Sequence, residues 1–343
     1  MIHIPDTIEI NDDIRRLTSV VCHSLSDVPD IIDTWNEGKV ADVEGYYENA
    51  KINRVYVDRV HVKKAFAEYT AAYNADDPKI KLKIDHTYRV AALCERIAKA
   101  AGMCAYDVEL AWLSGMLHDV GRFEQIKRYN TFSDADSVDH AKFGADLLFK
   151  DGLISTFLNG MVKCTGYKPG ALEDRYSSDG VFLYDRLNKS DMEMLELAIR
   201  CHNMYRIPQG LNRREQAFCN VLRDADKVDI FKVNIDTPLE EIYNTTTEEL
   251  MKSDITDEVL EAFDEEHCIL KAIRRTPADT VIGHVSLAYE LVYDESVRIT
   301  VEQGYLAKLM HFHSDNEETN RKMAMVREKM DSYVKKRIGE KDA

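Results

Sequence analysis

The chain has 343 residues, of which 45% are hydrophobic and 31% are charged, and its formal net charge is −16. This composition indicates a folded protein with a large core and argues against disorder along the whole chain. The negative charge argues against nucleic acid as a partner, because a protein that binds the phosphate backbone needs a basic surface. It does not exclude a small anionic substrate, since a bound metal ion supplies positive charge locally.

The cysteines and the N-terminus indicate the compartment. The seven cysteines are scattered, and no two of them form a Cys-x-x-Cys pair. This pattern favours reduced thiols over a disulfide framework or a zinc knuckle. The acidic N-terminus lacks the apolar stretch of a signal peptide, and no run of about 18 apolar residues occurs in the chain. We therefore expect a cytoplasmic protein that has no membrane partner.

Apolar residues recur at helical spacing along most of the chain, and clear strand alternation is hard to find. Seven prolines and 15 glycines are the only strong interruptions of this pattern. The sequence therefore predicts an all-α protein. We divide it into an N-terminal extension over residues 1–57, a helical domain over residues 58–315 and a C-terminal amphipathic helix over residues 316–343.

The first half of the helical domain is expected to contain three helices followed by a loop. Residues 58–74 form the first helix, and the second helix carries an apolar stripe that includes His86 and ends at Gly102. The third helix covers residues 107–118. A glycine soon after it predicts the end of this helical run, and the polar residues 122–136 are expected to form a loop.

The second half of the domain begins with a helix that starts near Ser137. Residues 152–189 are irregular, and this long segment is either a lid over a site or a surface excursion. Two patterns of the capping-box type follow, at Ser190–Glu193 and at Asn212–Glu215, and each predicts the start of a helix.

Four histidines and one aspartate share an unusual position in these helices. Each lies on the apolar stripe of a different helix and near a helix end: His86, His118, His140, His202 and Asp226. A single histidine of this kind is usually a core residue that bonds a carbonyl group, but four repeats indicate a metal site in a helical core. Nitrogen and oxygen ligands without thiolate suit iron, manganese, cobalt, nickel or zinc.

The order of these residues resembles a family signature. His86, then the pair His118-Asp119, then an aspartate within Arg223–Asp229 is similar to the H…HD…D pattern of the HD-domain superfamily. That resemblance covers motifs between about Asp58 and Lys232. It implies a helical bundle with N- and C-terminal helical extensions, in a family that consists mainly of metal-dependent phosphohydrolases.

Two further histidines extend the resemblance. His140 and His202 match the additional histidines of the binuclear H…HD…H…H…D branch, which includes cyclic-dinucleotide phosphodiesterases, diadenosine-tetraphosphate hydrolases and a few diiron oxygenases. The run after His202 lacks the Gly-Tyr-Pro motif of the cyclic-dinucleotide enzymes, which argues against that substrate.

The last aspartate of the signature has two candidates, Asp224 and Asp226. Two residues apart on a helix, they point to different faces, so only one can join the site. Asp226 shares a face with Leu222 and directly precedes Lys227, as the family's aspartate precedes its basic residue. We therefore favour Asp226, and we expect Asp224 to cap a helix, pair with a charge or support a ligand.

The resemblance implies a dinuclear site in which Asp119 bridges two divalent ions. His86, His118 and Asp226 would complete one ion's ligands, and the other ion would bind the two additional histidines. Iron or manganese is expected first, with nickel, cobalt, zinc and magnesium as alternatives. A bridging water would lose its proton readily and attack a phosphoester.

Two basic residues are candidates for contact with the substrate. Arg122 follows the His-Asp pair by three residues, and we expect it to act with Asp119 in catalysis by binding a phosphate with two hydrogen bonds. The alternative for Arg122 is a helix-end charge that interacts with the helix dipole. Lys227 is expected either to neutralise a carboxylate or to contact the substrate.

Two other functions use the same ligands. One is a diiron oxygenase, similar to inositol oxygenase or to a phosphonate-cleaving oxygenase. The other is a regulatory module that senses a nucleotide and recruits a partner through the C-terminal helix. For the hydrolase we expect a small phosphorylated substrate, with nucleotides among the candidates. We expect the C-terminal stripe, Met323 to Val334, to pack on its own domain, with a homodimer interface as the alternative.

Overall fold

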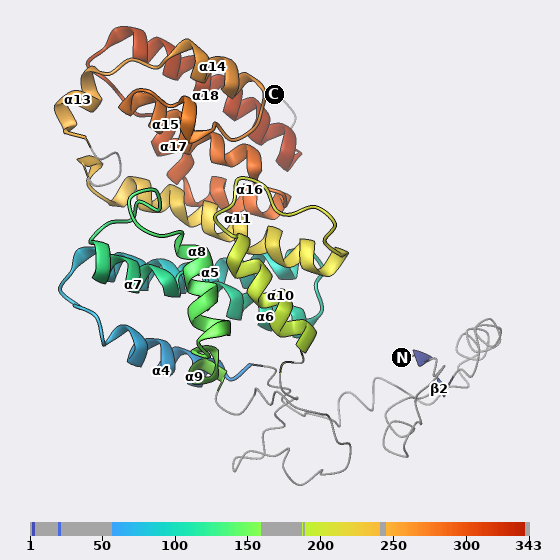
Figure 1. Cartoon of the computed structure of the whole chain (residues 1–343). Helices are drawn as coiled ribbons and strands as arrows, with labels where there is room; N and C mark the ends of the chain where they lie inside the picture. Colours follow the sequence, from blue (N-terminus) through green and yellow to red (C-terminus); the bar gives the residue numbers. More distant parts are fainter. Residues whose placement is uncertain are drawn as a thin grey trace. The chain divides into compact units, whose positions relative to one another are not determined.

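The computed structural model describes residues 2–3, 20–21, 57–158, 187, 189–240 and 245–339 (Figure 1). Residues 56–170 and 185–343 belong to one compact unit. Outside this unit the described residues form two strands of two residues each, β1 (Ile2–His3) and β2 (Val20–Val21), which pair in parallel. Every other described element is a helix, so the all-α prediction is confirmed. None of the described helices is both long enough and apolar enough to cross a membrane.

Three helices form the centre of the compact unit. α5 (Pro78–Ala100), α6 (Ala105–Leu117) and α11 (Arg213–Asp236) pack against one another. In α5 the Asp77 side chain accepts a hydrogen bond from the Lys79 amide, and Pro78 occupies the first turn, where its missing amide hydrogen costs nothing. α6 is buried around most of its circumference, which explains why its sequence is apolar almost throughout.

Shorter helices surround these three. α4 (Arg59–Thr70) and α9 (Ile154–Leu158) pack together, and α8 (His140–Ala145) packs on α10 (Lys189–Cys201). α8 continues into one π-helical turn over Asp146–Lys150. The capping box predicted at Asn212 is present at the start of α11, whereas α10 already begins at Lys189, so Ser190 lies inside its first turn. The helix expected from Ser137 begins at His140 instead, after the cap residue Asp139.

The loop predicted over residues 122–136 is partly wrong, because α7 (Val120–Tyr129) occupies its first half. Val120, Phe123 and Ile126 are buried at helical spacing, and the basic residues that suggested a loop lie in the last turn of the helix. The glycine expected to end the helical run, Gly121, lies in the first turn of α7. Gly121 packs against Gly144 of α8, and a Cβ added to Gly121 would lie 2.6 Å from the Gly144 nitrogen. Gly121 therefore permits close helix packing.

The C-terminal helices pack on one another, and α16 and α17 among them contact α11. They are α13 (Thr247–Lys252), α14 (Asp257–Asp264), α15 (Pro277–Val285), α16 (Asp294–Gln303), α17 (Tyr305–Met310) and α18 (Glu317–Ile338), with two short 3-10 segments at Lys271–Ile273 and Ser286–Glu290. The apolar stripe of α18, with Met323, Val326 and Met330, is buried against this part of its own chain.

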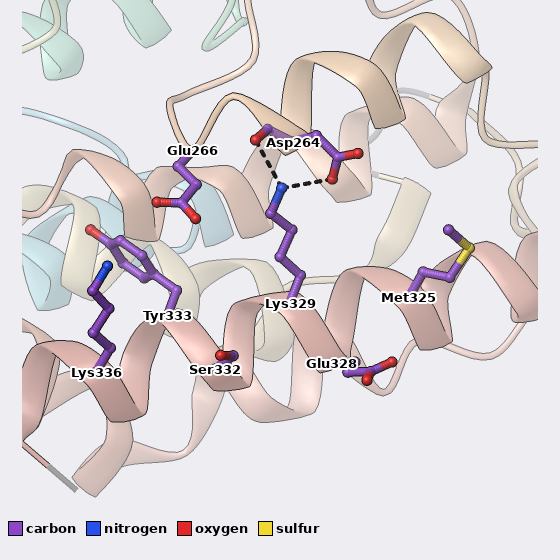
Figure 2. Close-up of a pocket in the computed structure, with 8 residues that line it drawn as sticks. All are labelled: Asp264, Glu266, Met325, Glu328, Lys329, Ser332, Tyr333 and Lys336. Carbon is purple, nitrogen blue, oxygen red and sulfur yellow. Dashed lines mark hydrogen bonds and ion pairs between the residues drawn. The ribbon is translucent and has the colours of Figure 1, made fainter. Parts of the chain in front are cut away.

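A shallow surface hollow runs along α18 (Figure 2). Lys329 crosses it, and its Nζ lies 2.7 Å from Oδ1 of Asp264 and 2.8 Å from the main-chain oxygen of that residue. Acidic and basic side chains alternate around the hollow, and its lining contains no histidine or cysteine. It offers no converging set of ligand atoms.

Candidate metal centre

The structure brings together all six residues predicted to be metal ligands, from six helices or their ends. His86 lies on α5, His118 and Asp119 lie at the junction of α6 and α7, His140 is the first residue of α8, His202 directly follows α10, and Asp226 lies on α11. All are buried except Asp226, whose side chain is 15% exposed. They divide into two groups of donors, each built around Asp119.

The first pocket is formed by His86, His118, Asp226 and one oxygen of Asp119. The Nε2 atoms of the two histidines lie 3.3 Å apart, and each is 3.6 Å from Oδ2 of Asp119. Oδ1 of Asp226 lies 3.1 Å from Nε2 of His86 and 3.8 Å from Nε2 of His118. Four donor atoms thus face one another across a space of metal-ion size.

The second pocket is formed by His140, His202 and the other oxygen of Asp119. The two Nε2 atoms are 3.0 Å apart, and they lie 3.4 Å and 3.8 Å from Oδ1 of Asp119. Asp119 therefore turns one carboxylate oxygen toward each pocket. It lies, with His118, in the two-residue junction between the end of α6 and the start of α7.

Each histidine is held through its Nδ1 atom. His86 contacts Asp229 Oδ2 at 2.6 Å and His140 contacts Asp134 Oδ2 at 2.7 Å, whereas His118 and His202 contact the carbonyl oxygens of Gly115 and Ile199, three residues earlier. Because all four partners are acceptors, the Nδ1 atoms carry protons and the Nε2 atoms face the pockets.

Two buried carboxylates that support these histidines were not predicted. Asp229 accepts from His86 and, with both oxygens, from Arg89. It lies three residues after Asp226 on α11, so helical spacing placed it on the same face. Asp134 accepts from His140, Arg122, Gln125 and Asn203. It lies in the segment between α7 and α8, where periodicity gives no signal.

Arg122 supports the second pocket by donating a hydrogen bond to Asp134, which holds His140. Its Nη1 donates to Asp134, to Gln125 and to the carbonyl oxygen of Phe132, while its Nε lies 3.8 Å from Oδ1 of Asp119. Nε is buried and has no hydrogen-bond partner among the described residues. The arginine is therefore oriented by its own chain through one end of the guanidinium group.

The two charged residues beside Asp226 on α11, Asp224 and Lys227, have separate roles. Both oxygens of Asp224 accept from the amide of Val292, and one also accepts from the Tyr293 amide and the Ser296 hydroxyl at the start of α16. Asp224 thus joins α11 to the C-terminal helices.

Lys227 is buried and makes no hydrogen bond or ion pair in the described part of the chain. Burial, and then the nearby Arg223, lower its pKa to about 8.

Lys83 is a third residue of the site that was not predicted from the sequence. Its Nζ lies 2.7 Å from Oδ2 of Asp119, the oxygen that faces the first pocket, and its side chain is 16% exposed. It lies one helical turn before His86 on α5, so spacing alone could have identified it. Polar residues at that distance are common on a helix, however, and no residue pattern distinguished this lysine from the exposed ones around it.

Electrostatics keep the donor atoms in the form that binds a cation. Burial acts to raise the pKa of the Asp119 carboxyl, but Lys83 and the histidines outweigh it and hold that pKa well below its ordinary value. Burial lowers the pKa of His118, and it lowers those of His140 and His202 to about 4. These three rings are therefore neutral at pH 7.

His86 differs from the other three histidines. Burial and then Lys83 act to lower its pKa, but hydrogen bonds to Asp226 and Asp229 outweigh them, and the pKa is raised. Its partner Asp226 shows the opposite result: burial acts to raise the pKa of that carboxyl, but the hydrogen bond to His86 and the charges of the histidines lower it.

These residues fit a metal site. In the second pocket, where the pKa values of both histidines are lowered, two Nε2 lone pairs point at one another, which is unfavourable for neutral imidazoles unless a cation lies between them. Carboxylate oxygens complete each group, and acceptors fix every ring from behind. Imidazole and carboxylate donors without thiolate are suited to iron, manganese, cobalt, nickel or zinc.

Comparison with known proteins supports the same assignment. A family model described as HD domain matches residues 84–232, a range that begins just before His86 and includes the other five predicted ligands. Searches of the curated proteins and of the solved structures gave no match. Residues 84–232 of this chain therefore match an HD domain, and they contain buried His/Asp clusters typical of the HD metal site.

Proposed function

We propose that this chain is a metal-dependent phosphohydrolase that uses two divalent ions. The observation that carries the proposal is the placement of Asp119, which offers one oxygen to each of two histidine pairs. His86, His118 and Asp226 would hold one ion, and His140 and His202 would hold the other. Iron and manganese are the first candidates, followed by nickel, cobalt, zinc and magnesium.

Ions bound in this way would activate a water molecule as the nucleophile and offset negative charge on the phosphoryl group. The chain itself orients the donors. Asp229 and Asp134 fix two of the imidazole rings, and main-chain carbonyls fix the other two. Such outer contacts raise the basicity of the ligands and keep the Nε2 atoms aimed inward. Burial of the donors excludes bulk water around them.

The role proposed for Arg122 now includes positioning. Because its Nη1 is shared among three acceptors, a phosphate contact would have to use the Nε side of the guanidinium group. We propose that Arg122 supports His140 by holding Asp134, and that any contact with substrate is made beside Oδ1 of Asp119. For Lys227, burial next to Asp226 favours neutralisation of a carboxylate over contact with a substrate.

The first test is the metal content per chain after oxygen-free purification, for the wild type, His140→Ala and the control His311→Ala, whose histidine is exposed on α17's C-terminal side. We expect about two ions in the wild type and the control, and about one in His140→Ala. One ion in all three proteins would contradict the dinuclear site.

The second test compares substrates with and without oxygen. Nucleoside monophosphates, dinucleoside polyphosphates and small phosphate esters are offered to the manganese- and iron-loaded proteins. Release of phosphate or nucleotide without oxygen supports hydrolysis. Turnover that requires both iron and oxygen would overturn it in favour of a diiron oxygenase. Tight nucleotide binding without any turnover would favour a regulatory module.

A further inference from the structure

We infer that Lys83, which no motif of the family signature includes, binds the phosphoryl group of the substrate, and that the preferred substrate is a dianionic phosphomonoester. The inference rests on the proposed phosphohydrolase function and adds the charge of the substrate to it. It follows from the position of the ammonium group, from its freedom to exchange partners and from the total charge of the site.

The position of Lys83 is unusual for a residue beside a metal site. Its Nζ lies 2.7 Å from a carboxylate oxygen that also faces His86 and His118 at 3.6 Å. A fixed positive charge at that distance repels a metal ion, so the lysine opposes metal binding by itself. It becomes favourable when an anion binds beside the metal, because the ammonium group can then donate to that anion.

Lys83 is free to make such a contact, whereas Arg122 is largely committed. Asp119 is the single hydrogen-bond acceptor of Lys83 in the described part of the chain, and a metal ion would compete for the same oxygen. The Nη1 of Arg122, in contrast, is held by three acceptors. The Lys83 stem is flexible and partly exposed, and its Nζ lies 5.6 Å from the centre of the Phe132 ring.

The charges of the site favour a dianion. Arg89 balances Asp229, Arg122 balances Asp134, and the charge of Lys227 offsets that of nearby Asp224, so each of these pairs is neutral. Asp119, Asp226 and Lys83 remain, and together they carry a single negative charge. Two divalent ions would bring the site to a net charge of three positive, or two without the lysine. A phosphomonoester dianion offsets this charge better than a phosphodiester monoanion does.

The experiment measures binding of inorganic phosphate to the manganese-loaded full chain by calorimetry. It compares Lys83→Met, Lys83→Arg and the control Lys81→Met, which removes the same charge from an exposed position on the same helix. We expect phosphate affinity to fall about tenfold to a hundredfold in Lys83→Met, as for loss of a hydrogen bond between charged groups, and to recover in part in Lys83→Arg. The control should match the wild type.

A second measurement follows the metal itself. Without phosphate, Lys83→Met should bind manganese at least as tightly as the wild type, because a repelling charge is gone. Weaker manganese binding in this variant would show that Lys83 supports the metal site instead, and would overturn the inference. So would a phosphate affinity within twofold of the wild type at equal metal content.

The choice between monoester and diester is tested by competition. Methyl phosphate should displace bound phosphate at lower concentration than dimethyl phosphate, and Lys83→Met should reduce this preference. Equal displacement by both compounds would overturn the substrate assignment. If no phosphoester is hydrolysed but phosphate binding still depends on Lys83, the proposed function fails while the anion site remains. If hydrolysis proceeds and Lys83→Met changes neither phosphate affinity nor KM, the inference alone fails.

Discussion

Each pocket of the metal centre contains one histidine held by an aspartate–arginine pair and one held by a main-chain carbonyl. His86 with Asp229 and Arg89 corresponds to His140 with Asp134 and Arg122. The pockets differ in charge, because among the described residues only the first has a carboxylate of its own, Asp226, in addition to the shared Asp119. We infer that the common plan allows both pockets to bind cations, and that the extra carboxylate makes the first pocket bind more tightly.

Removing the shared ligand should have the largest effect. Asp119→Ala takes one donor from each pocket and the only carboxylate from the second, so we expect loss of both ions and of all turnover. Elemental analysis measures the metal, and circular dichroism checks that the helices remain. Asp136→Ala, at an exposed position, is the control. Full metal occupancy in Asp119→Ala would contradict the bridging role.

Acid should affect the second pocket most. The pKa values of His140 and His202 are lowered to about 4, by burial first and then by Arg122 and by His118 respectively, whereas His86 in the first pocket has a raised pKa. Between pH 6.5 and 5.5 the unfolded chain therefore takes up protons on these two histidines that the folded chain does not. The contribution of His140 and His202 to the free energy of unfolding is therefore fully present above the ordinary histidine pKa, and it is lost as the pH falls below that value.

For the metal-free protein we expect the free energy of unfolding to drop by roughly 2 kcal/mol over this pH range from the two histidines together. Urea unfolding in the presence of a chelator, at both pH values, measures it. His202→Gln should show about half the drop, since one of the two groups is gone. An equal drop in both proteins would mean that His202 does not cause the acid sensitivity.

The smallest effect is expected from the carboxylates behind the ligands. Asp134→Asn and Asp229→Asn each keep an oxygen acceptor for the histidine and lose only the charge, so metal affinity should fall about tenfold, the lower end of the range for such contacts. Each substitution should weaken only its own pocket, which a chelator titration of the two ions can separate. Asp151→Asn, exposed beyond the π-helical turn, serves as the control. If either substitution weakened both pockets equally, the two supports would not be independent.

The sequence was most informative where a residue's role follows from helical spacing. The buried faces of α5 and α11 placed His86 and Asp226, and the same spacing could have identified Lys83 and Asp229, one turn away from each. It was least informative where the role depends on how loops close. Asp134 could not be foreseen, because its four donors come from α7, from α8 and from the residue after His202.

The helix α7 was not predicted for a similar reason, because it depends on a contact between distant parts of the chain. Gly121 usually indicates the end of a helix when only the local sequence is considered. In this fold the relevant neighbour is Gly144, more than 20 residues later, and the contact between them depends on tertiary packing. The position of Arg122 follows from it, because α7 carries the arginine toward Asp134 instead of leaving it in a loop.

The contact between Gly121 and Gly144 also affects the spacing of the main chains that carry the candidate metal ligands. Gly121 lies two residues after Asp119, and Gly144 lies four residues after His140, so the main chains that carry the shared ligand and a second-pocket ligand meet where neither has a side chain. An added Cβ on Gly144 would lie 2.9 Å from the Gly121 nitrogen. The spacing of these two main chains therefore depends on two missing side chains, and a methyl group at Gly121 would press on the main-chain oxygen of His140 itself.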